Sequence, residues 1–356
     1  MTTILNPTSR TQIASNQLMG QLEAQQNKKA EAETAAVSSK YQARLNNELR
    51  LQDQWRDVKA DTGKATTALS GTVGKLKTLL NRIESQISAI NRINLDVAAG
   101  KTVNTDIYAN GFDAAIRGMD SVARNSGNPK LLSDDNAKLE YEININGQTA
   151  EVQGVSVTSD YYILDSNGDR WQLDRQAGNL KRYTDYPDGG TSDVAYLRGG
   201  IQLDSLSGTD ITFTINPDSA DPKQFSGTIK SSGAGLKDSW FYGNLASDAN
   251  RTSALEDLRS AKVGLELELS RYEAAKTISS FYETRANEEI QGRQETINDT
   301  QLARVAEIQE LQAKLSREFQ ATSNSVALGF AAKNQYQALF SSFNSGFVNA
   351  LINVYA

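Results

Sequence analysis

VGKLKTLLNRIESQISAINRINLDV, residues 73–97, decides the fold class of this chain. Large apolar side chains recur in it at alternating intervals of three and four residues: Val73, Leu76, Leu80, Ile83, Ile87 and Ile90. Val97 resumes the register after the polar Asn94. This a/d pattern puts one apolar stripe along a helix and is typical of a coiled coil or a helical bundle. We therefore expect a helix here that packs against other helices.

The five prolines leave both ends of the chain free to form long helices. None lies in residues 8–128 or 223–356, and a proline inside a helix costs about 3 kcal/mol. Residues 14–55 are rich in Gln, Glu, Lys and Ala and contain few large apolar side chains. We expect this segment to be helical in an assembly but only marginally stable alone.

The C-terminal part of the chain carries two further apolar stripes. The first consists of Leu255, Leu258, Leu265, Leu269 and Tyr272. The second has spacings of three and four residues and includes Leu302, Val305, Ile308, Leu311, Leu315 and Phe319. Gly264 and Gly292 are weak points in this part, because glycine destabilises a helix interior, and they argue against one unbroken helix.

Between Lys138 and Trp240 the sequence changes to alternating apolar residues separated by turn dipeptides. The clearest alternating run ends at Asn146-Gly147, a hairpin signal, and its apolar members are Leu139, Tyr141, Ile143 and Ile145. The region predicts a small antiparallel β domain with a core of its own. Because it is inserted between two helical arms, the arms must run back alongside each other.

The sequence thus predicts an α+β protein: a long antiparallel helical coiled coil or bundle built from the N- and C-terminal arms, with a central antiparallel β domain inserted between them. The expected segments are an N-terminal helical arm (1–60), N-terminal coiled-coil helices (61–132), the central β domain (133–245), C-terminal coiled-coil helices (246–340) and an apolar C-terminal tail (341–356).

The composition argues against most enzyme classes. The 356 residues include no Cys and no His, so thiol nucleophiles, Ser-His-Asp triads, zinc sites and His-ligated haem are excluded. We expect no catalytic activity and no cofactor. The formal net charge of −6 disfavours nucleic-acid binding. No apolar run is long enough to cross a membrane, so we expect no membrane insertion. Residues 1–30 contain no apolar segment of the kind found in cleaved secretory signals, so we expect no such signal there.

One loop resembles a calcium-binding sequence. Asp165, Asn167 and Asp169 occur in DSNGD, but an EF-hand loop requires Gly at its sixth position and an acidic residue at its twelfth. Those positions hold Arg170 and Gln176. A hairpin turn around Asn167-Gly168 is the better interpretation, and a calcium contact from the loop carboxylates stays open.

The C-terminal tail is apolar and nearly uncharged. After Glu318 the only charged residue is Lys333. The large apolar residues of this stretch include Tyr336, Leu339, Phe340, Phe343, Phe347, Val348, Leu351 and Ile352. Monomers rarely expose such a stripe. We expect it to be buried against other copies of the chain, with docking on the chain's own core as the alternative.

The two ends of the chain resemble bacterial flagellins. Residues 298–303 (NDTQLA), followed by 311–313 (LQA) and 339–340 (LF), are similar to the flagellin C-terminal helix, in which a D-x-D-[LY]-A turn leads into a Gln- and Leu-rich helix. Residues 2–6 (TTILN) are similar to flagellin openings. Three departures from the family's pattern are present. Gln301 replaces the second Asp of the turn, residues 44–61 stand in place of the Ser-Gly-rich motif that normally follows the first helix, and residues 341–356 run past the usual end.

The resemblance implies a structural subunit, without enzymatic chemistry, that polymerises into an extracellular flagellar filament with its β domain facing outward. The implied partners are other copies of the chain, flagellar hook-associated or cap proteins, and an export chaperone. The alternatives are a hook-associated junction protein, a type III secretion tip or filament protein, and a coiled-coil adhesin; a carboxylate-based enzyme ranks after them.

Self-assembly through both helical arms would involve a set of apolar residues that spans the chain. The candidate self-assembly residues are Ile4, Leu5, Leu76, Leu80, Ile83, Ile87, Ile90, Leu302, Val305, Ile308, Leu311, Leu315, Phe319, Leu339, Phe340, Phe347 and Ile352.

Overall fold

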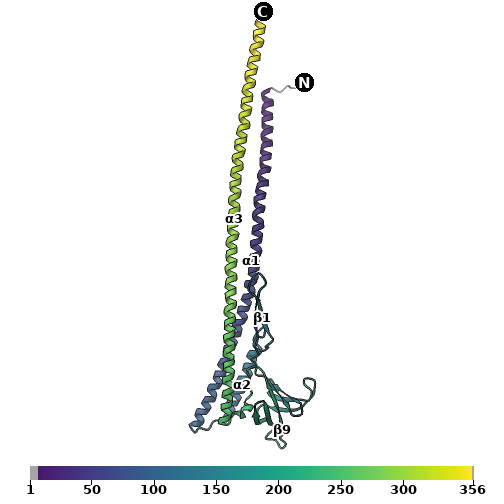
Figure 1. Cartoon of the computed structure of the whole chain (residues 1–356), viewed down its shortest axis with the longest axis vertical. Coiled ribbons are helices and arrows are strands. Elements are labelled where there is room, and N and C mark those ends of the chain that lie inside the picture. Colours follow the sequence, from purple (N-terminus) through teal and green to yellow (C-terminus); the bar gives the residue numbers. More distant parts are fainter. Residues whose placement is uncertain (1–6, 355–356) are drawn as a thin grey trace. The chain divides into compact units, whose positions relative to one another are not determined.

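The computed structural model describes residues 7–354, and the side chains of residues 12–336 and 338–340. The first and last elements along the chain are two long helices, α1 (Pro7–Ala98) and α3 (Asp248–Val354) (Figure 1). Between them lie the shorter helix α2 (Thr105–Arg124), nine strands and a short 3-10 helix, η1 (Ser239–Leu245). The predicted α+β architecture, helical arms around a central antiparallel β region, is confirmed.

The residues form two compact units. Unit 1 contains the described residues up to Gln54 and those from Glu288 onward, and unit 2 is Trp55–Asn287. Both units contain a part of α1 and a part of α3.

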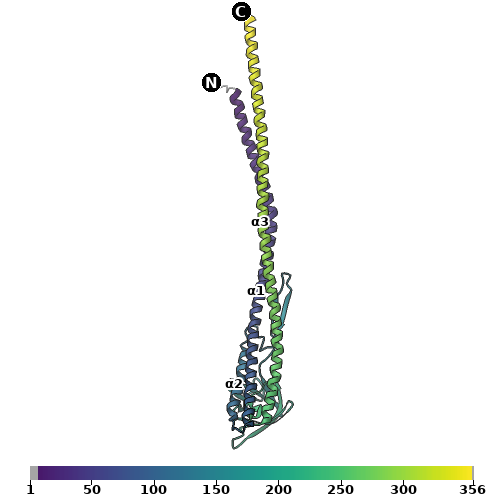
Figure 2. The ribbon, with the colours of Figure 1, turned by 90° about the vertical axis from the view of Figure 1, so that its left-hand side faces the viewer.

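In unit 1, α1 and α3 run antiparallel and lie side by side in both views of the ribbon (Figures 1 and 2). Contacts between side chains define the register. Lys40 Nζ lies 2.9 Å from Glu307, and further along α1 the carboxylate of Glu48 lies 3.1 Å from Arg293. As residue numbers rise along α1, those of the partners on α3 fall, which is the antiparallel arrangement that the sequence predicted.

The interior of unit 1 is thin. Among its described side chains, the fully buried apolar ones are Leu45, Ile297 and Leu315. Polar groups occupy other interior positions, since Gln52 is also buried and donates a hydrogen bond to Gln294 at 3.1 Å. A pair of helices with so few buried apolar side chains gains little stability from packing.

Unit 2 contains the strands, and all of their pairings are antiparallel. A two-stranded sheet pairs β1 with β2, and a seven-stranded sheet has the order β6-β5-β4-β3-β9-β8-β7. The strands are β1 (Lys138–Glu142), β2 (Thr149–Gln153), β3 (Tyr161–Asp165), β4 (Arg170–Asp174), β5 (Asn179–Tyr183), β6 (Thr191–Tyr196), β7 (Ile201–Ser207), β8 (Asp210–Ile215) and β9 (Lys223–Ser231).

One hydrophobic core joins the strands of unit 2 to its helices. It includes Leu76 of α1, Phe112 of α2, Trp171 of β4, Phe213 of β8 and Leu258 of α3. The expectation that the strands have a core of their own is therefore wrong. Each sheet buries one face, and the apolar stripes of the helices supply the surface that covers it.

The prediction that glycine interrupts the C-terminal helix is also wrong. α3 continues through Gly264 and Gly292 without a break. A glycine costs a helix only about 1 kcal/mol relative to alanine. Buried neighbours on the same helix, such as Leu265 and Ile297, outweigh this cost. None of the helices in the described residues has an apolar stretch long enough to cross a lipid bilayer.

Candidate functional site

The candidate assembly residues of α1 lie inside unit 2. Leu76, Leu80, Ile83 and Ile90 are buried in its core, and Ile87 packs against it half-buried. Their partners are other residues of the same chain. The expectation that this helix packs against other helices is confirmed, since α2, α3 and the strands of the same chain cover the stripe. A role of these five side chains in assembly stays a prediction.

The candidate stripe of α3 divides into two groups. Leu315 is 3% exposed, and Ile308, Leu311 and Phe319 are half-buried. In contrast, Leu302 and Val305 are 69% and 51% exposed. These two residues therefore do not share the face of α3 that packs against α1, and their role in self-assembly stays a prediction.

The spacing explains this division. Residues 302, 305 and 308 follow one another at intervals of three, and each such interval falls about 60° short of a full turn. Leu302 is consequently rotated by about 120° from Ile308 around the helix. Leu302 and Val305 therefore face solvent instead of α1.

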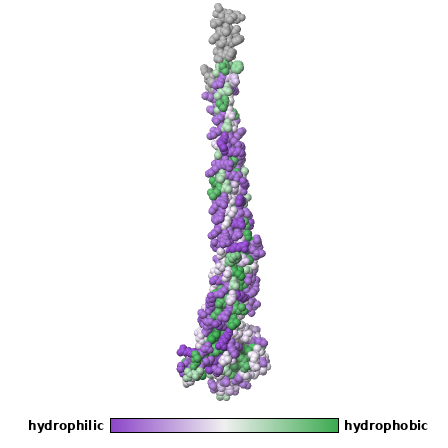
Figure 3. All heavy atoms as spheres, turned by 60° about the vertical axis from the view of Figure 1, so that its left-hand side comes forward, coloured by the Kyte–Doolittle hydropathy of each residue, from purple (hydrophilic) through white to green (hydrophobic). Residues whose placement is uncertain are grey.

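Unit 1 exposes further large apolar side chains. On α3 these include Leu328, Tyr336, Leu339 and Phe340, each more than half exposed. Together with Leu302 and Val305 they form what we call the exposed apolar set. On α1, Ile13, Leu18 and Leu49 are also exposed. Figure 3 shows small groups of apolar side chains between polar stretches along the helices.

Sequence periodicity missed four of these residues, Leu328, Ile13, Leu18 and Leu49, because none of them belongs to a long run with regular spacing of three and four residues. Ile4 and Leu5 lie outside the described residues, and Phe347 and Ile352 lie outside the described side chains.

α3 extends past the first described residue of α1. Met19 of α1 contacts Ser323 of α3, with the sulfur 3.9 Å from the hydroxyl oxygen. Counting twelve residues back from Met19 to Pro7, and twelve forward from Ser323, puts Pro7 opposite about residue 335 of the antiparallel helix. The helix continues to Val354. Leu339 and Phe340 thus lie past the position opposite Pro7.

The DSNGD loop is the hairpin turn between β3 and β4. Asp165 Oδ1 accepts hydrogen bonds from the backbone N–H groups of Asn167 and Asp169, both at 3.0 Å. Gly168 has a φ of +87°, which glycine adopts without strain. The predicted hairpin turn is confirmed.

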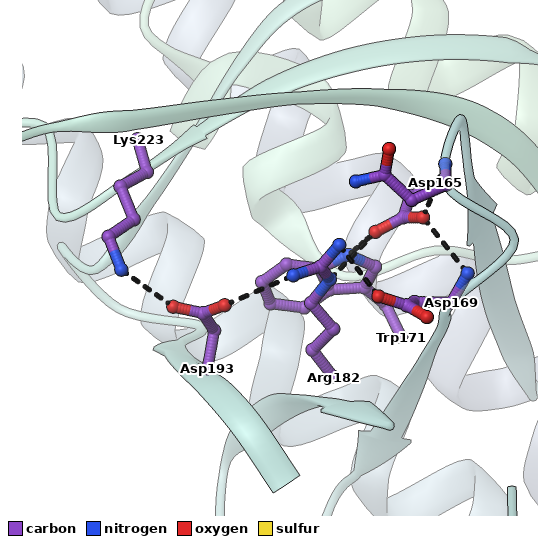
Figure 4. A network of polar contacts seen from close by, with 7 residues as sticks. Asp165, Asp169, Trp171, Arg182, Asp193 and Lys223 are labelled. Atoms are coloured by element: carbon purple, nitrogen blue, oxygen red, sulfur yellow. Dashed lines mark hydrogen bonds and ion pairs between the residues drawn. The ribbon is translucent and has the colours of Figure 1, made fainter. Parts of the chain in front are cut away.

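An arginine on the next strand occupies the space between the loop carboxylates (Figure 4). Arg182 lies opposite Trp171 in the β4–β5 register, and its guanidinium contacts Asp165 and Asp169, each at 2.8 Å. Its third acidic partner is Asp193 at 3.5 Å.

The loop carboxylates are therefore already paired with a cation. The described residues contain no group of three or more acidic side chains arranged to hold a metal ion. Sequence reasoning missed Arg182, because a local pattern does not report which strand lies beside a loop.

The chain is similar to a few solved structures, at low sequence identity. No protein-family model matches the chain, and no curated protein matches it. Among solved structures, it is similar to flagellar hook-associated protein 3 from Legionella pneumophila, with 13% identity, a TM-score of 0.33, and coverage of 77% of this chain and 99% of that one. It is also similar to FlgL from Xanthomonas campestris, with 12% identity, a TM-score of 0.22, and coverage of 78% and 99%. At TM-scores of 0.33 and 0.22, neither likeness establishes a shared fold or function.

Proposed function

We propose that this chain is a structural subunit that polymerises through its terminal helices into an extracellular filament of the flagellar type. The β domain faces outward, and the chain performs no chemistry. Its partners are other copies of itself, together with flagellar hook-associated or cap proteins and an export chaperone. The flagellin-like residues at both ends of the chain support this proposal, and the observation that carries it is the exposed apolar set of unit 1.

The exposed apolar set is costly to leave in water. Leu302, Leu328, Tyr336 and Phe340 are each at least 65% exposed, and covering one large apolar side chain contributes about 1.5–3 kcal/mol. Few charges offset this surface, since Lys333 is the only charged residue after Glu318. At about 100° per residue, Leu302 and Phe340 point to nearly opposite sides of α3, so more than one neighbour is needed to cover the set. Further copies of this chain present the same exposed apolar side chains on their own α3.

Thin packing in unit 1 couples its folding to assembly. Leu45, Ile297 and Leu315 alone are fully buried and apolar among its described side chains. Contacts with neighbouring copies would add to this small interior, so polymerisation stabilises the paired helices by mass action. Helices that are marginally stable as a monomer also suit export before assembly.

A charge placed in the exposed apolar set tests the proposal. Leu302→Asp should leave the monomer's stability within about 0.5 kcal/mol, because the side chain is exposed. It should abolish sedimenting polymer, because an unpaired carboxylate would be buried between copies. The matched control is Ala303→Asp, which adds the same charge at an exposed position of the same helix without removing a large apolar side chain.

Sedimentation and thermal melting of both variants, beside the wild type, give the answer. The proposal predicts polymer from the wild type and from Ala303→Asp, and none from Leu302→Asp. Normal polymer from Leu302→Asp would show that this face of α3 takes no part in assembly.

A further inference from the structure

Three arginines from separate elements line one cavity of unit 2. Arg117 comes from α2, Arg175 from the turn between β4 and β5, and Arg198 from the turn between β6 and β7. The cavity has a volume of about 580 Å³, which is within the usual range of about 300–1,000 Å³ for small-molecule sites. The backbone N–H of Leu197 donates to the carbonyl oxygen of Gly178 at 3.1 Å and ties the two turns together.

Arg175 is fixed in the wall of this cavity. Its Nη1 donates to Asp238 Oδ1 at 2.9 Å, and its Nη2 donates to the carbonyl oxygen of Ser159. Asp238 is fully buried, and its second oxygen accepts a hydrogen bond from Tyr161 at 2.8 Å. The Nε of Arg175 is buried and has no hydrogen-bond partner among the described residues. Arg175 is thus held in place by its buried partners, and its charge is balanced by Asp238.

The other two arginines have free donors. Neither Arg117 nor Arg198 has a hydrogen-bond or ion-pair partner within the described part of the chain. Asp113 is the acidic residue of the lining. Its carboxylate already accepts bonds from the backbone N–H and the hydroxyl of Ser239, at 2.6 and 2.8 Å. Because Arg175 is balanced by Asp238, the positive charge of the cavity comes from Arg117 and Arg198, set against the one carboxylate of Asp113.

The chemistry of the lining selects a class of ligand. Guanidinium forks match the planar geometry of a carboxylate and bind it through two parallel hydrogen bonds. Tyr196 also lines the cavity and is 61% exposed, so it offers an apolar ring and a polar hydroxyl. A sugar ring has the same combination of an apolar face and hydroxyl groups. The volume is also larger than a simple inorganic anion requires.

We infer that this cavity, which we name the arginine pocket (Arg117, Arg175, Tyr196 and Arg198), binds a sugar that carries a carboxylate, such as a uronate or a sialate. The carboxylate lies between Arg117 and Arg198, and the sugar ring lies on Tyr196. The site belongs to unit 2 and does not depend on polymerisation, so the two proposals stand or fall separately.

Calorimetric titration of the full chain tests this inference. The probes are D-glucuronate and N-acetylneuraminate, with D-glucose as a neutral sugar and inorganic phosphate at the same ionic strength. We expect saturable binding of the acidic sugars only. Arg198→Ala should weaken it by about tenfold or more, the loss typical of a hydrogen bond to a charged group.

Two further variants make the result specific. Arg198→Lys keeps the charge but removes the fork, and it should also weaken binding. Arg259→Ala removes an exposed arginine of α3 that does not line the pocket, and it should have no effect. The inference is overturned if neither acidic sugar binds, if phosphate binds as tightly, or if Arg259→Ala weakens binding as much as Arg198→Ala.

Discussion

Tyr272 anchors α3 to the segments that flank the small β1–β2 sheet, and its removal has a calculable effect. The side chain is fully buried. Its hydroxyl lies 3.1 Å from the carbonyl oxygen of Leu131 and 3.1 Å from that of Gln153, so it donates to either one. Tyr272→Phe keeps the ring and removes this donor. The Leu131 carbonyl keeps a second donor, the backbone N–H of Val155 at 2.7 Å, so the substitution removes one net hydrogen bond. The free energy of unfolding at neutral pH should therefore fall by about 0.5–1.5 kcal/mol.

The pH dependence of stability should change as well. Burial raises the pKa of Tyr272 to about 12, from an ordinary value of 10.0. Between these values the unfolded chain has lost the phenolic proton while the folded chain retains it. Unfolding therefore becomes easier as the pH rises through this interval. Two pKa units correspond to about 2.7 kcal/mol, and Tyr272→Phe should lack this contribution.

Urea denaturation followed by tryptophan fluorescence measures both effects, because Trp55, Trp171 and Trp240 all lie in unit 2. Burial also raises the pKa values of Tyr161 and Tyr242. Both residues are present in the two proteins, so the difference between wild type and variant reports Tyr272 alone. That difference should shrink or reverse sign between pH 10 and 12. A difference that stays constant over this range would refute the reasoning.

Two further substitutions test the interior of unit 2 by the same denaturation assay. Leu76→Ala should lower the free energy of unfolding by about 2–5 kcal/mol because it opens a cavity in the core. The control Leu95→Ala, at a 72% exposed position, should change it by less than about 0.5 kcal/mol. Equal effects of the two substitutions would contradict the core assignment. Arg182→Ala should lower it by about 3–5 kcal/mol because Asp165 would be left buried without its cation, and a loss below about 1 kcal/mol would show that the network is not stabilising.

Periodicity in the sequence was sufficient to predict the helices and hairpins. The alternating three- and four-residue spacing of residues 73–90 predicts a helix, and Asn167-Gly168 predicts a turn, because both signals are local. Periodicity does not report which surface covers a stripe. Leu76 and Ile83 were therefore candidates for self-assembly on the sequence alone, although α2, α3 and the sheet of the same chain cover them.

The candidate surfaces depended on contacts between distant residues. Asp165 and Arg182 are 17 residues apart and meet because β4 and β5 pair in one particular register. Arg117 and Arg198 are 81 residues apart and line the same pocket because α2 lies beside the turn between β6 and β7. Leu302 does not lie on the same face as Leu315, because residues spaced by three stay on one face of a helix only when intervals of four compensate for them.

Electron microscopy of the purified full chain under salting-out conditions tests most directly whether the exposed apolar set joins copies into a polymer. Salting-out anions strengthen apolar association, so assembly should be favoured there. We expect filaments of uniform width with a regular helical repeat. Particles no larger than one chain at every salt concentration, or irregular aggregates without a repeat, would contradict the proposed filament function.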